Sequence, residues 1–368
     1  MLSFALAFLV SLLVTLFIVR FAHLQEGVLG DTDLAGVQKF HARPVPRIGG
    51  VGILCGLTAS AVQVRWGYPA VSGGILGIIA CGMPAFLSGL LEDLTKRVSP
   101  LVRLVCTMAA AGLAYAFLDI AVTRISMPPL DFLLSYAVIS CAVTVFAVAA
   151  LANAVNIIDG FNGLASMVAF MMFASLAYVA FQVHDPIVLS DSLIMMGAVM
   201  GFFIWNFPAG LIFLGDGGAY FVGFMLGELA IMLVMRNRDV SAWYPVLLFM
   251  YPIFETCFSI YRKKFIRGIS PGIPDGVHLH MLVYKRLMRA VGAKNAHELT
   301  RRNSLTSPYL WLLCLIAVIP ATLFWRHTVH LFCFVVVFAA TYVWLYISIV
   351  RFKAPRWLVF RRPHTVKK

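Results

Sequence analysis

Long apolar stretches recur along the whole chain, separated by short segments that hold most of the charged residues. A helix needs about 20 mostly apolar residues to cross a hydrocarbon layer of about 30 Å, and the stretches have about that length. They are too long and too continuously apolar for barrel strands, which alternate over about ten residues. The pattern therefore predicts an all-α polytopic membrane helix bundle with about 11 transmembrane helices, at residues 2–22, 48–64, 73–92, 101–118, 133–152, 163–182, 190–205, 217–235, 242–261, 309–325 and 330–351.

The composition agrees with this prediction. Of the 368 residues, 61% are hydrophobic and 12% are charged, about half the charged fraction of a soluble domain. The seven cysteines lie inside or at the edges of apolar stretches without the spacing of metal ligands, so we expect them to be packing residues. We expect residues 1–368 to form a single integral membrane domain.

The positions of the basic residues explain most of the net charge of +13. Lys and Arg gather in the segments on one side of the predicted bundle, as is typical of cytoplasmic loops. This pattern predicts a periplasmic N-terminus and a cytoplasmic C-terminus, and it leaves only five of the 29 Lys and Arg residues outside: Arg65, Arg124, Arg236, Arg238 and Arg326. The positive charge can also attract anionic lipid or a diphosphate, and we expect no nucleic-acid partner.

Polar motifs occupy the predicted cytoplasmic loops, and carboxylates mark the helix ends beside them. Glu92 and Asp93 end one span, Asp159 follows another, and Asp216 lies between glycines before a third. A charged group close to hydrocarbon is costly and is usually kept for pairing or function. We therefore expect one site at the membrane surface, formed by loops 23–47, 93–100, 153–162, 206–216 and 262–308.

The chemistry of these residues favours a metal-bound phosphate as the ligand. Glycines before a helix expose N–H groups to an anion, and Mg²⁺ commonly takes one or two carboxylates while phosphate oxygens and water complete its shell. Each feature has a simpler explanation when taken alone. The adjacent acids could be a solvated helix end, Asp159 a turn or cap, the GDGG sequence a plain turn, and His278 and His280 surface histidines. Their joint occurrence on one side favours the functional interpretation.

Taken together, the motifs resemble the polyprenyl-phosphate N-acetylhexosamine-1-phosphate transferase family, over roughly residues 31 to 285. The family also contains the phospho-N-acetylmuramoyl-pentapeptide transferase of peptidoglycan synthesis. The resemblance rests on the KFHARPVPRIGG segment, the paired acids, the Asn-x-x-Asn-x-x-Asp-Gly motif, the NxP and GDxG elements and the histidine loop. These contain Lys39, His41, Arg47, Glu92, Asp93, Asn153, Asn156, Asp159, Asn206, Gly215, Asp216, His278 and His280.

Two departures from the family pattern are visible. The first of the paired acids is usually aspartate, whereas here it is Glu92, so Asp93 is the better candidate for a close role. The histidine loop reads HLHM and lacks the longer histidine run of the muramoyl-pentapeptide branch. The resemblance therefore favours the simpler UDP-sugar branch, with the pentapeptide transferase as the alternative.

The resemblance implies an enzyme that transfers N-acetylhexosamine-1-phosphate from a UDP-sugar to undecaprenyl phosphate, releases UMP and starts a lipid-linked glycan such as O-antigen. It implies Mg²⁺ (or Mn²⁺) on Asp216 and Asp93, and Asp93, Glu92 and Asp159 as catalytic residues. Substrate would be bound by Lys39, His41, Arg47, Asn153, Asn156, Asn206, Gly215, His278 and His280. The expected location is the bacterial inner membrane, in contact with membrane lipid, and a homodimer is left open.

Two other classes of function fit the sequence less well. An ion-coupled transporter would place its acids near the bilayer midplane in paired repeats, and no internal repeat is visible. A structural scaffold would leave the polar motifs unexplained. The sequence does not distinguish GlcNAc from GalNAc or a deoxy-aminosugar, a choice we expect loop 262–308 to make. Glu228 and Glu255 lie within predicted spans, where we expect each to pack with a hydrogen-bond partner.

Overall fold

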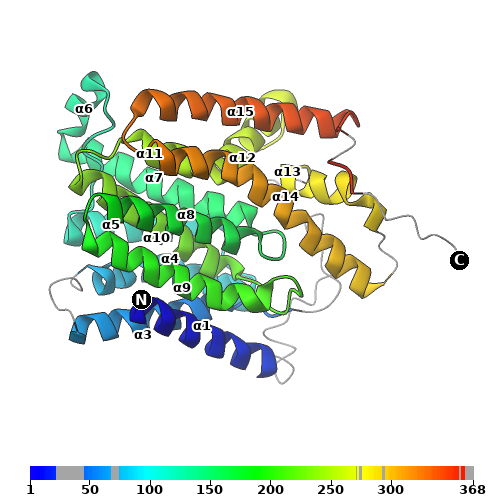
Figure 1. The fold of residues 1–368 in the computed structure, drawn as a ribbon, viewed down its shortest axis with the longest axis horizontal. Helices are drawn as coiled ribbons and strands as arrows, with labels where there is room; N and C mark the ends of the chain where they lie inside the picture. The colour runs from blue at the N-terminus through cyan, green and yellow to red at the C-terminus, as the bar shows by residue number, and fades with distance from the viewer. Residues whose placement is uncertain are drawn as a thin grey trace, which may run out of the picture.

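The computed structural model describes residues 1–21, 45–67, 74–270, 272, 276–291, 295–355 and 358–360, and the regular elements of this part of the chain are helices (Figure 1). Among these residues, nine helices are long and apolar enough to cross a membrane: α1 (Leu2–Phe21), α4 (Ile75–Thr95), α5 (Pro100–Leu118), α7 (Ala137–Ile158), α8 (Leu164–Gln182), α9 (Pro186–Asn206), α10 (Gly215–Arg236), α14 (Ala296–Leu323) and α15 (Thr328–Val350). The polytopic all-α membrane bundle is therefore confirmed, while the count of 11 spans and the sides of the termini stay predictions.

Two of the predicted spans differ from these nine. The second is one continuous helix, α3 (Gly49–Gly67), which is less apolar than the others. The ninth, predicted over 242–261, is broken at Phe249 into α11 (Trp243–Leu248) and α12 (Met250–Tyr261). Pro252 has no N–H group to donate to the carbonyl of Leu248, so an unbroken α-helix would lose a hydrogen bond at this point.

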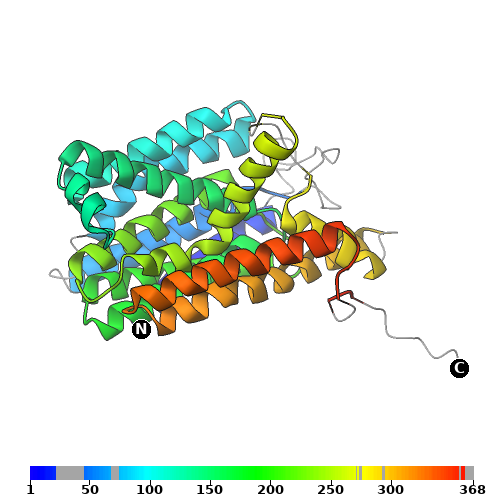
Figure 2. The same cartoon turned by 90° about the horizontal axis from the view of Figure 1, so that it is seen from above.

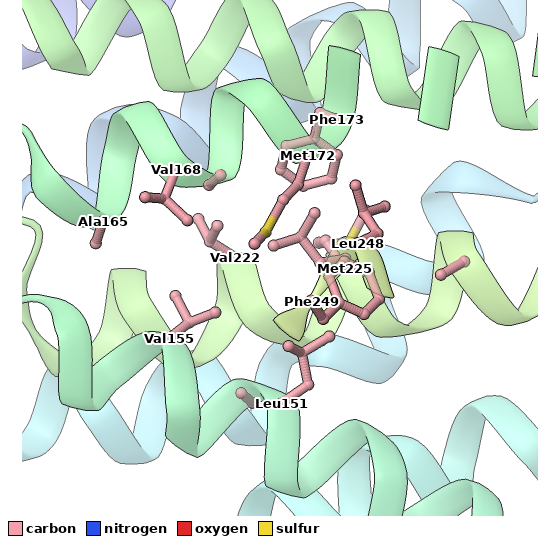
Figure 3. Packing of buried hydrophobic residues seen from close by; sticks show 14 of the residues in the cluster. Leu151, Val155, Ala165, Val168, Met172, Phe173, Val222, Met225, Leu248 and Phe249 are labelled. Carbon is pink, nitrogen blue, oxygen red and sulfur yellow. The ribbon is translucent and has the colours of Figure 1, made fainter. Parts of the chain in front are cut away.

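Helix α10 forms the centre of the bundle. Its most apolar stretch is 83% buried, compared with 17% for α1 and 22% for α15, and it contacts α3, α4, α5, α7, α8 and α9. Figure 3 shows part of the core, where Val222 and Met225 of α10 lie between side chains of α7 and α8. Small residues allow closer approach, as between Gly223 and the backbone of Ala152, where an added Cβ would lie only 2.5 Å away.

The shorter helices lie at the two ends of the bundle. Helix α6 (Pro128–Leu134) precedes α7 at one end, while α13 (Leu279–Leu282) lies at the opposite end (Figure 1). The π-helical turns η2 (Arg262–Ile266) and η3 (Val283–Leu287) and the 3₁₀ turn η4 (Arg289–Val291) complete the segment between α12 and α14. Figure 2 shows α14 and α15 side by side along one flank of the bundle. The end that carries α13 also holds the candidate site.

Candidate active site

A cavity of about 420 Å³ opens at the end of the bundle that carries α13. It is lined by charged and amide side chains from helices that are far apart in the sequence. The polar motifs of the predicted loops therefore converge, as expected from the sequence. The lining residues are Arg47, Glu92, Arg103, Asn156, Ile157, Asp159, Gly160, Phe161, Asn206, Phe213, Gly215, Asp216, His278, His280, Met281 and Asn303. Acids and arginines therefore share one polar pocket.

Asp93 lies against the first turn of α10. Its Oδ2 accepts a hydrogen bond of 3.0 Å from the N–H of Gly217, and its side chain is almost fully buried. This approach requires glycines, because a Cβ on Gly89 would lie 2.4 Å from the nitrogen of Gly217 and one on Gly215 would lie 2.6 Å from Asp93 Oδ2. Helix N-termini favour negative charge, so the backbone of α10 stabilises the carboxylate.

Two arginines flank Asp216. Arg103 of α5 forms an ion pair with its Oδ2, and Arg47 Nη2 lies 3.8 Å from its Oδ1. Arg47 also lies 3.8 Å from Asp93 through its Nε, so one guanidinium faces both acids. Tyr220 lies under the Arg103 guanidinium at 5.8 Å and donates a hydrogen bond of 3.1 Å to Asn153 Oδ1. Asn153 is thereby placed behind the cavity and not on its wall.

Main-chain hydrogen bonds join the segment before α3 to the segment before α10. Phe213 donates to the carbonyl of Pro46 at 2.9 Å, and Gly49 donates to the carbonyl of Phe213 at 3.0 Å. A third bond of 3.0 Å runs from Gly50 to Leu214. Gly215 has φ +76° and lies so close to the Arg47 carbonyl that any side chain would clash with it. This joint holds Arg47 beside the two acids.

Asp159 follows the last residue of α7, and its carboxyl group lies in a low-dielectric part of the cavity. Burial raises its pKa to about 7; Arg47 opposes this shift and Asp93 adds to it. In the free protein Asp159 is therefore partly protonated at neutral pH. The next residue, Gly160, packs on the ring of His280. A Cβ at this position would lie 3.5 Å from His280 Nε2.

The two histidines of the HLH sequence lie together on the cavity wall. The rings of His278 and His280 stack at 5.2 Å with 9° between their planes, and His280 also contacts Phe161 edge-on. Burial lowers the pKa of His280 to about 4, which keeps its ring neutral at pH 7. Both rings turn their Nδ1 toward Glu255 of α12.

Two of the sequence-predicted site residues make bonds to the backbone. Asn206 Oδ1 accepts a 2.6 Å bond from the N–H of Gly163 and its Nδ2 donates to the carbonyl of Ile212, which ties two turns together. Glu92 Oε2 accepts a 2.7 Å bond from the N–H of Val98 and closes the turn after α4. Lys39 and His41 lie outside the described residues, so their predicted contacts stay predictions.

The residues around Asp216 can hold a divalent cation only together with a ligand. Among the described residues, no three His, Cys, Asp or Glu side chains are close enough to form a metal cage. Mg²⁺ needs only one or two protein carboxylates when phosphate supplies further oxygens. Asp93 Oδ1 accepts no hydrogen bond from a described residue, and the guanidinium of Arg47 lies 3.8 Å from both this oxygen and Asp216 Oδ1. The donor set fits a cation shared with a diphosphate.

A second cavity, of about 740 Å³, adjoins the first and shares Phe213 and Asn303 with it. It lies between the loop that follows α9 and the first part of α14. Its wall is more apolar than that of the first cavity and is formed by Val45, Asn162, Phe207, Pro208, Ala209, Gly210, Leu211, Phe213, Ala296, His297, Thr300, Arg301, Asn303, Ser304, Leu305 and Pro308. Together the two cavities can hold a charged group next to a larger, less polar one.

Residues 75–234, from α4 to α10, match glycosyl transferase family 4. The chain also resembles individual proteins over longer stretches. It is 28% identical over 291 residues to the probable undecaprenyl-phosphate N-acetylglucosaminyl 1-phosphate transferase of Bacillus subtilis, covering 76% of this chain and 77% of that protein. It is 30% identical over 278 residues, 65% of each chain, to the decaprenyl-phosphate N-acetylglucosaminephosphotransferase of Mycolicibacterium smegmatis. It is 23% identical over 256 residues, 69% of this chain and 73% of the relative, to the undecaprenyl-phosphate alpha-N-acetylglucosaminyl 1-phosphate transferase of Thermotoga maritima.

The part that matches glycosyl transferase family 4 contains Asp93, Asp159 and Asp216, whereas Arg47 and the two histidines lie outside it. The structure brings both parts to one cavity.

Sequence reasoning missed two charged residues of this site. Arg103 contributes to the predicted orientation as one of the basic residues on the predicted cytoplasmic side, and its place as a lone arginine in the first turn of an apolar helix is a usable hint to the site. Glu255 was expected only to pack with a hydrogen-bond partner, and its partner is the histidine loop. Glu228 differs from expectation, because neither of its buried oxygens has a hydrogen-bond partner among the described residues.

Proposed function

We propose that this chain transfers N-acetylhexosamine-1-phosphate from a UDP-sugar to undecaprenyl phosphate or a similar polyprenyl phosphate, with release of UMP. The observation that carries the proposal is the gathering of Asp159 and Asp216 from separate helices on one cavity that also holds Arg47 and Arg103, with Asp93 paired to Arg47. The names of the relatives support the same reaction class and suggest GlcNAc as the sugar.

The reaction forms a bond between an oxygen of the lipid phosphate and the sugar-bound phosphorus, and it breaks the bond from that phosphorus to UMP. Such phosphoryl transfer depends on positioning and on charge stabilisation. A phosphate with a second pKa near 6 is already largely dianionic at pH 7, so a strong base is not required. We therefore assign Asp93 and Asp159 to orienting the reactants, with Glu92 setting the turn beside them.

Asp216 and Asp93 would hold Mg²⁺ or Mn²⁺, which when bound would offset the negative charge that develops toward UMP. Arg47 and Arg103 would bind phosphate oxygens, for which guanidinium groups form strong charge-assisted hydrogen bonds. Both guanidiniums already face Asp216, so the phosphates would lie within reach of the acids and the cations together.

The second cavity would take the nucleoside. Phe213, shared by both cavities, offers a ring on which a base can stack, and Asn162 and Asn303, which are hydrogen-bonded to protein groups, fix the shape of the wall beside it. The sugar would then lie toward His278, His280 and Met281, which belong to the loop expected to select it. The site would face the cytoplasm of a bacterial inner membrane, and the product would start a lipid-linked glycan such as O-antigen.

The ion-coupled transporter is disfavoured by the same geometry. The acids of the cavity lie at helix ends on one side of the bundle, whereas transport sites lie near the midplane. Uptake into proteoliposomes would separate the two functions, because a transferase releases UMP without moving the nucleotide sugar across the bilayer.

The test is Asp216→Asn in the purified, detergent-solubilised chain, assayed for UMP release from UDP-GlcNAc and undecaprenyl phosphate. We expect a loss of about 100-fold or more, because an electrostatic group that acts at the transition state has been removed. Asp239→Asn is the matched control: it removes an exposed carboxylate between α10 and α11, beside Arg326, and we expect full activity. Turnover of D216N equal to that of D239N would remove Asp216 from the mechanism.

A further inference from the structure

The HLH segment owes its position in the cavity to a carboxylate on another helix. Glu255 of α12 is 1% exposed, and its Oε1 accepts a 2.7 Å hydrogen bond from the N–H of Leu279. The same oxygen lies 3.2 Å from His278 Nδ1 and 3.7 Å from His280 Nδ1. A single oxygen therefore contacts the backbone and both rings of the segment. Among the described residues, no other carboxylate lies within 4.0 Å of either histidine.

From this geometry we infer that Glu255 is a positioning residue for the proposed transfer, and that it acts through His278. The inference rests on the proposed function, because it assigns the Nε2 edge of His278 to the substrate side of the cavity. With Nδ1 directed at Glu255, Nε2 is the only ring nitrogen that His278 can offer to a phosphate or sugar oxygen.

The carboxylate does more than hold the ring in place. By accepting from Nδ1–H it selects the tautomer and the rotation of the ring, as carboxylates do for histidines that bind metals or act in catalysis. In that tautomer Nε2 can accept a hydrogen bond from a hydroxyl group of the sugar. His280 is held differently, since its ring packs on Phe161 and Gly160 and stays neutral.

The surroundings of Glu255 fix the segment from its other side as well. Arg262 donates hydrogen bonds of 2.8 Å to the carbonyl of Val277 and 2.7 Å to the hydroxyl of Tyr346, which anchors the residue before His278. The backbone of the histidine loop therefore has support besides Glu255, and a change at Glu255 that keeps its size can alter the ring of His278 without releasing the loop.

Glu228 shows why packing alone is a poor explanation for Glu255. Both are buried glutamates in apolar helices, but Glu228 makes no hydrogen bond to a described residue and does not line the cavity. Glu255, in contrast, directs its oxygen at two side chains that do line it. Glu228→Gln is therefore a matched control for Glu255→Gln, since both replace a buried carboxyl group by an amide with little change in shape.

The experiment compares UMP release by the wild type, E228Q, E255Q, E255D, H278A and the double variant E255Q/H278A, with thermal unfolding as the check on folding. We expect E255Q to lose about 10- to 100-fold in kcat/KM, as is typical when the partner of a functional histidine is removed. E255D keeps the charge but is shorter, and we expect it to be more active than E255Q. The double variant should be no less active than H278A alone.

Each opposite result would overturn the inference. A purely structural role predicts that the isosteric E255Q is more active than E255D. It also predicts that the fold-losses in kcat/KM of E255Q and H278A multiply in the double variant. Activity of E255Q equal to that of E228Q would also overturn it. Should E255Q fail to fold, E255D and the double variant E255D/H278A are compared with H278A instead. An inactive wild type would instead refute the proposed function, which is a separate outcome.

Discussion

Gly89 lies where α4 crosses α10 directly behind the acids, and Gly89→Ala is a sharp test of how the site is built. A Cβ at this position would lie 2.4 Å from the nitrogen of Gly217, 2.6 Å from its Cα and 2.6 Å from the carbonyl carbon of Asp216. All three are backbone atoms, so no side-chain rotation can make room. Ordinary contact begins near 3.4 Å, and the two helices must therefore separate by about 1 Å.

That separation changes both stability and activity. Overpacking of this kind costs about 1–3 kcal/mol, and stretching the bond from Gly217 to Asp93 weakens a hydrogen bond to a charged group that contributes about 1.5–3 kcal/mol. A displacement of about 1 Å between reacting groups can cost about 100-fold in rate. We expect G89A to lose about 10- to 100-fold in kcat and to unfold at a lower temperature.

Gly112→Ala supplies the control. Gly112 lies in α5, another helix long and apolar enough to span the membrane, but a Cβ there would have its nearest neighbour, Val145 Cγ2, at 4.0 Å. Helix propensity alone favours alanine by about 1 kcal/mol, so G112A should keep its activity and unfold at the same or a slightly higher temperature. UMP release and thermal unfolding are measured for both. If G89A matched G112A in both measurements, backbone contact between α4 and α10 could not be what positions Asp93.

Three further predictions concern the charges of the cavity. Arg103→Gln should lower kcat/KM by about 10- to 150-fold, the equivalent of about 1.5–3 kcal/mol for a hydrogen bond to a charged group. Arg326→Gln, which changes an exposed arginine, should leave kcat/KM unchanged, and equal activities of the two variants would exclude Arg103 from the site. Because the pKa of Asp159 is about 7 and its ionised form is the one proposed to act, kcat/KM should fall as the pH is lowered through about 7, and a flat profile between about pH 5.5 and 8 would contradict this. EDTA should stop UMP release and Mg²⁺ or Mn²⁺ should restore it, whereas turnover in EDTA would contradict a bridging cation.

Hydropathy predicted where helices form but not where they break. The interruption at Phe249 was invisible because Phe249 and Met250 are as apolar as their neighbours, and proline is tolerated inside membrane helices. Pro84 in α4, Pro308 and Pro320 indeed lie within continuous helices. A proline therefore marks a candidate break, and tertiary packing decides whether the helix is broken there.

The acids of the site were predictable because each stands at the end of an apolar helix, where a charge is conspicuous. The pairing of Arg103 with Asp216 and of Glu255 with the histidines was not, since it depends on how each helix is rotated and how deeply it lies. Motif spacing also does not show whether the polar atoms of a side chain in the cavity are already hydrogen-bonded to the protein. Glu92 and Asn206 line the cavity, but each side chain accepts a hydrogen bond from a backbone N–H group of another residue.

The joint between residues 46–50 and 213–214 has a practical consequence for protein engineering. Its three bonds use main-chain atoms only, so exchanging the side chain of Ile48, or that of Phe213 for any residue except proline, leaves every donor and acceptor in place. A mutant library can therefore vary these two positions while the wall that carries Arg47 keeps its shape. Changes at Gly49, Gly50 or Gly215 offer no such freedom, because there the neighbouring chain occupies the space that a side chain would need.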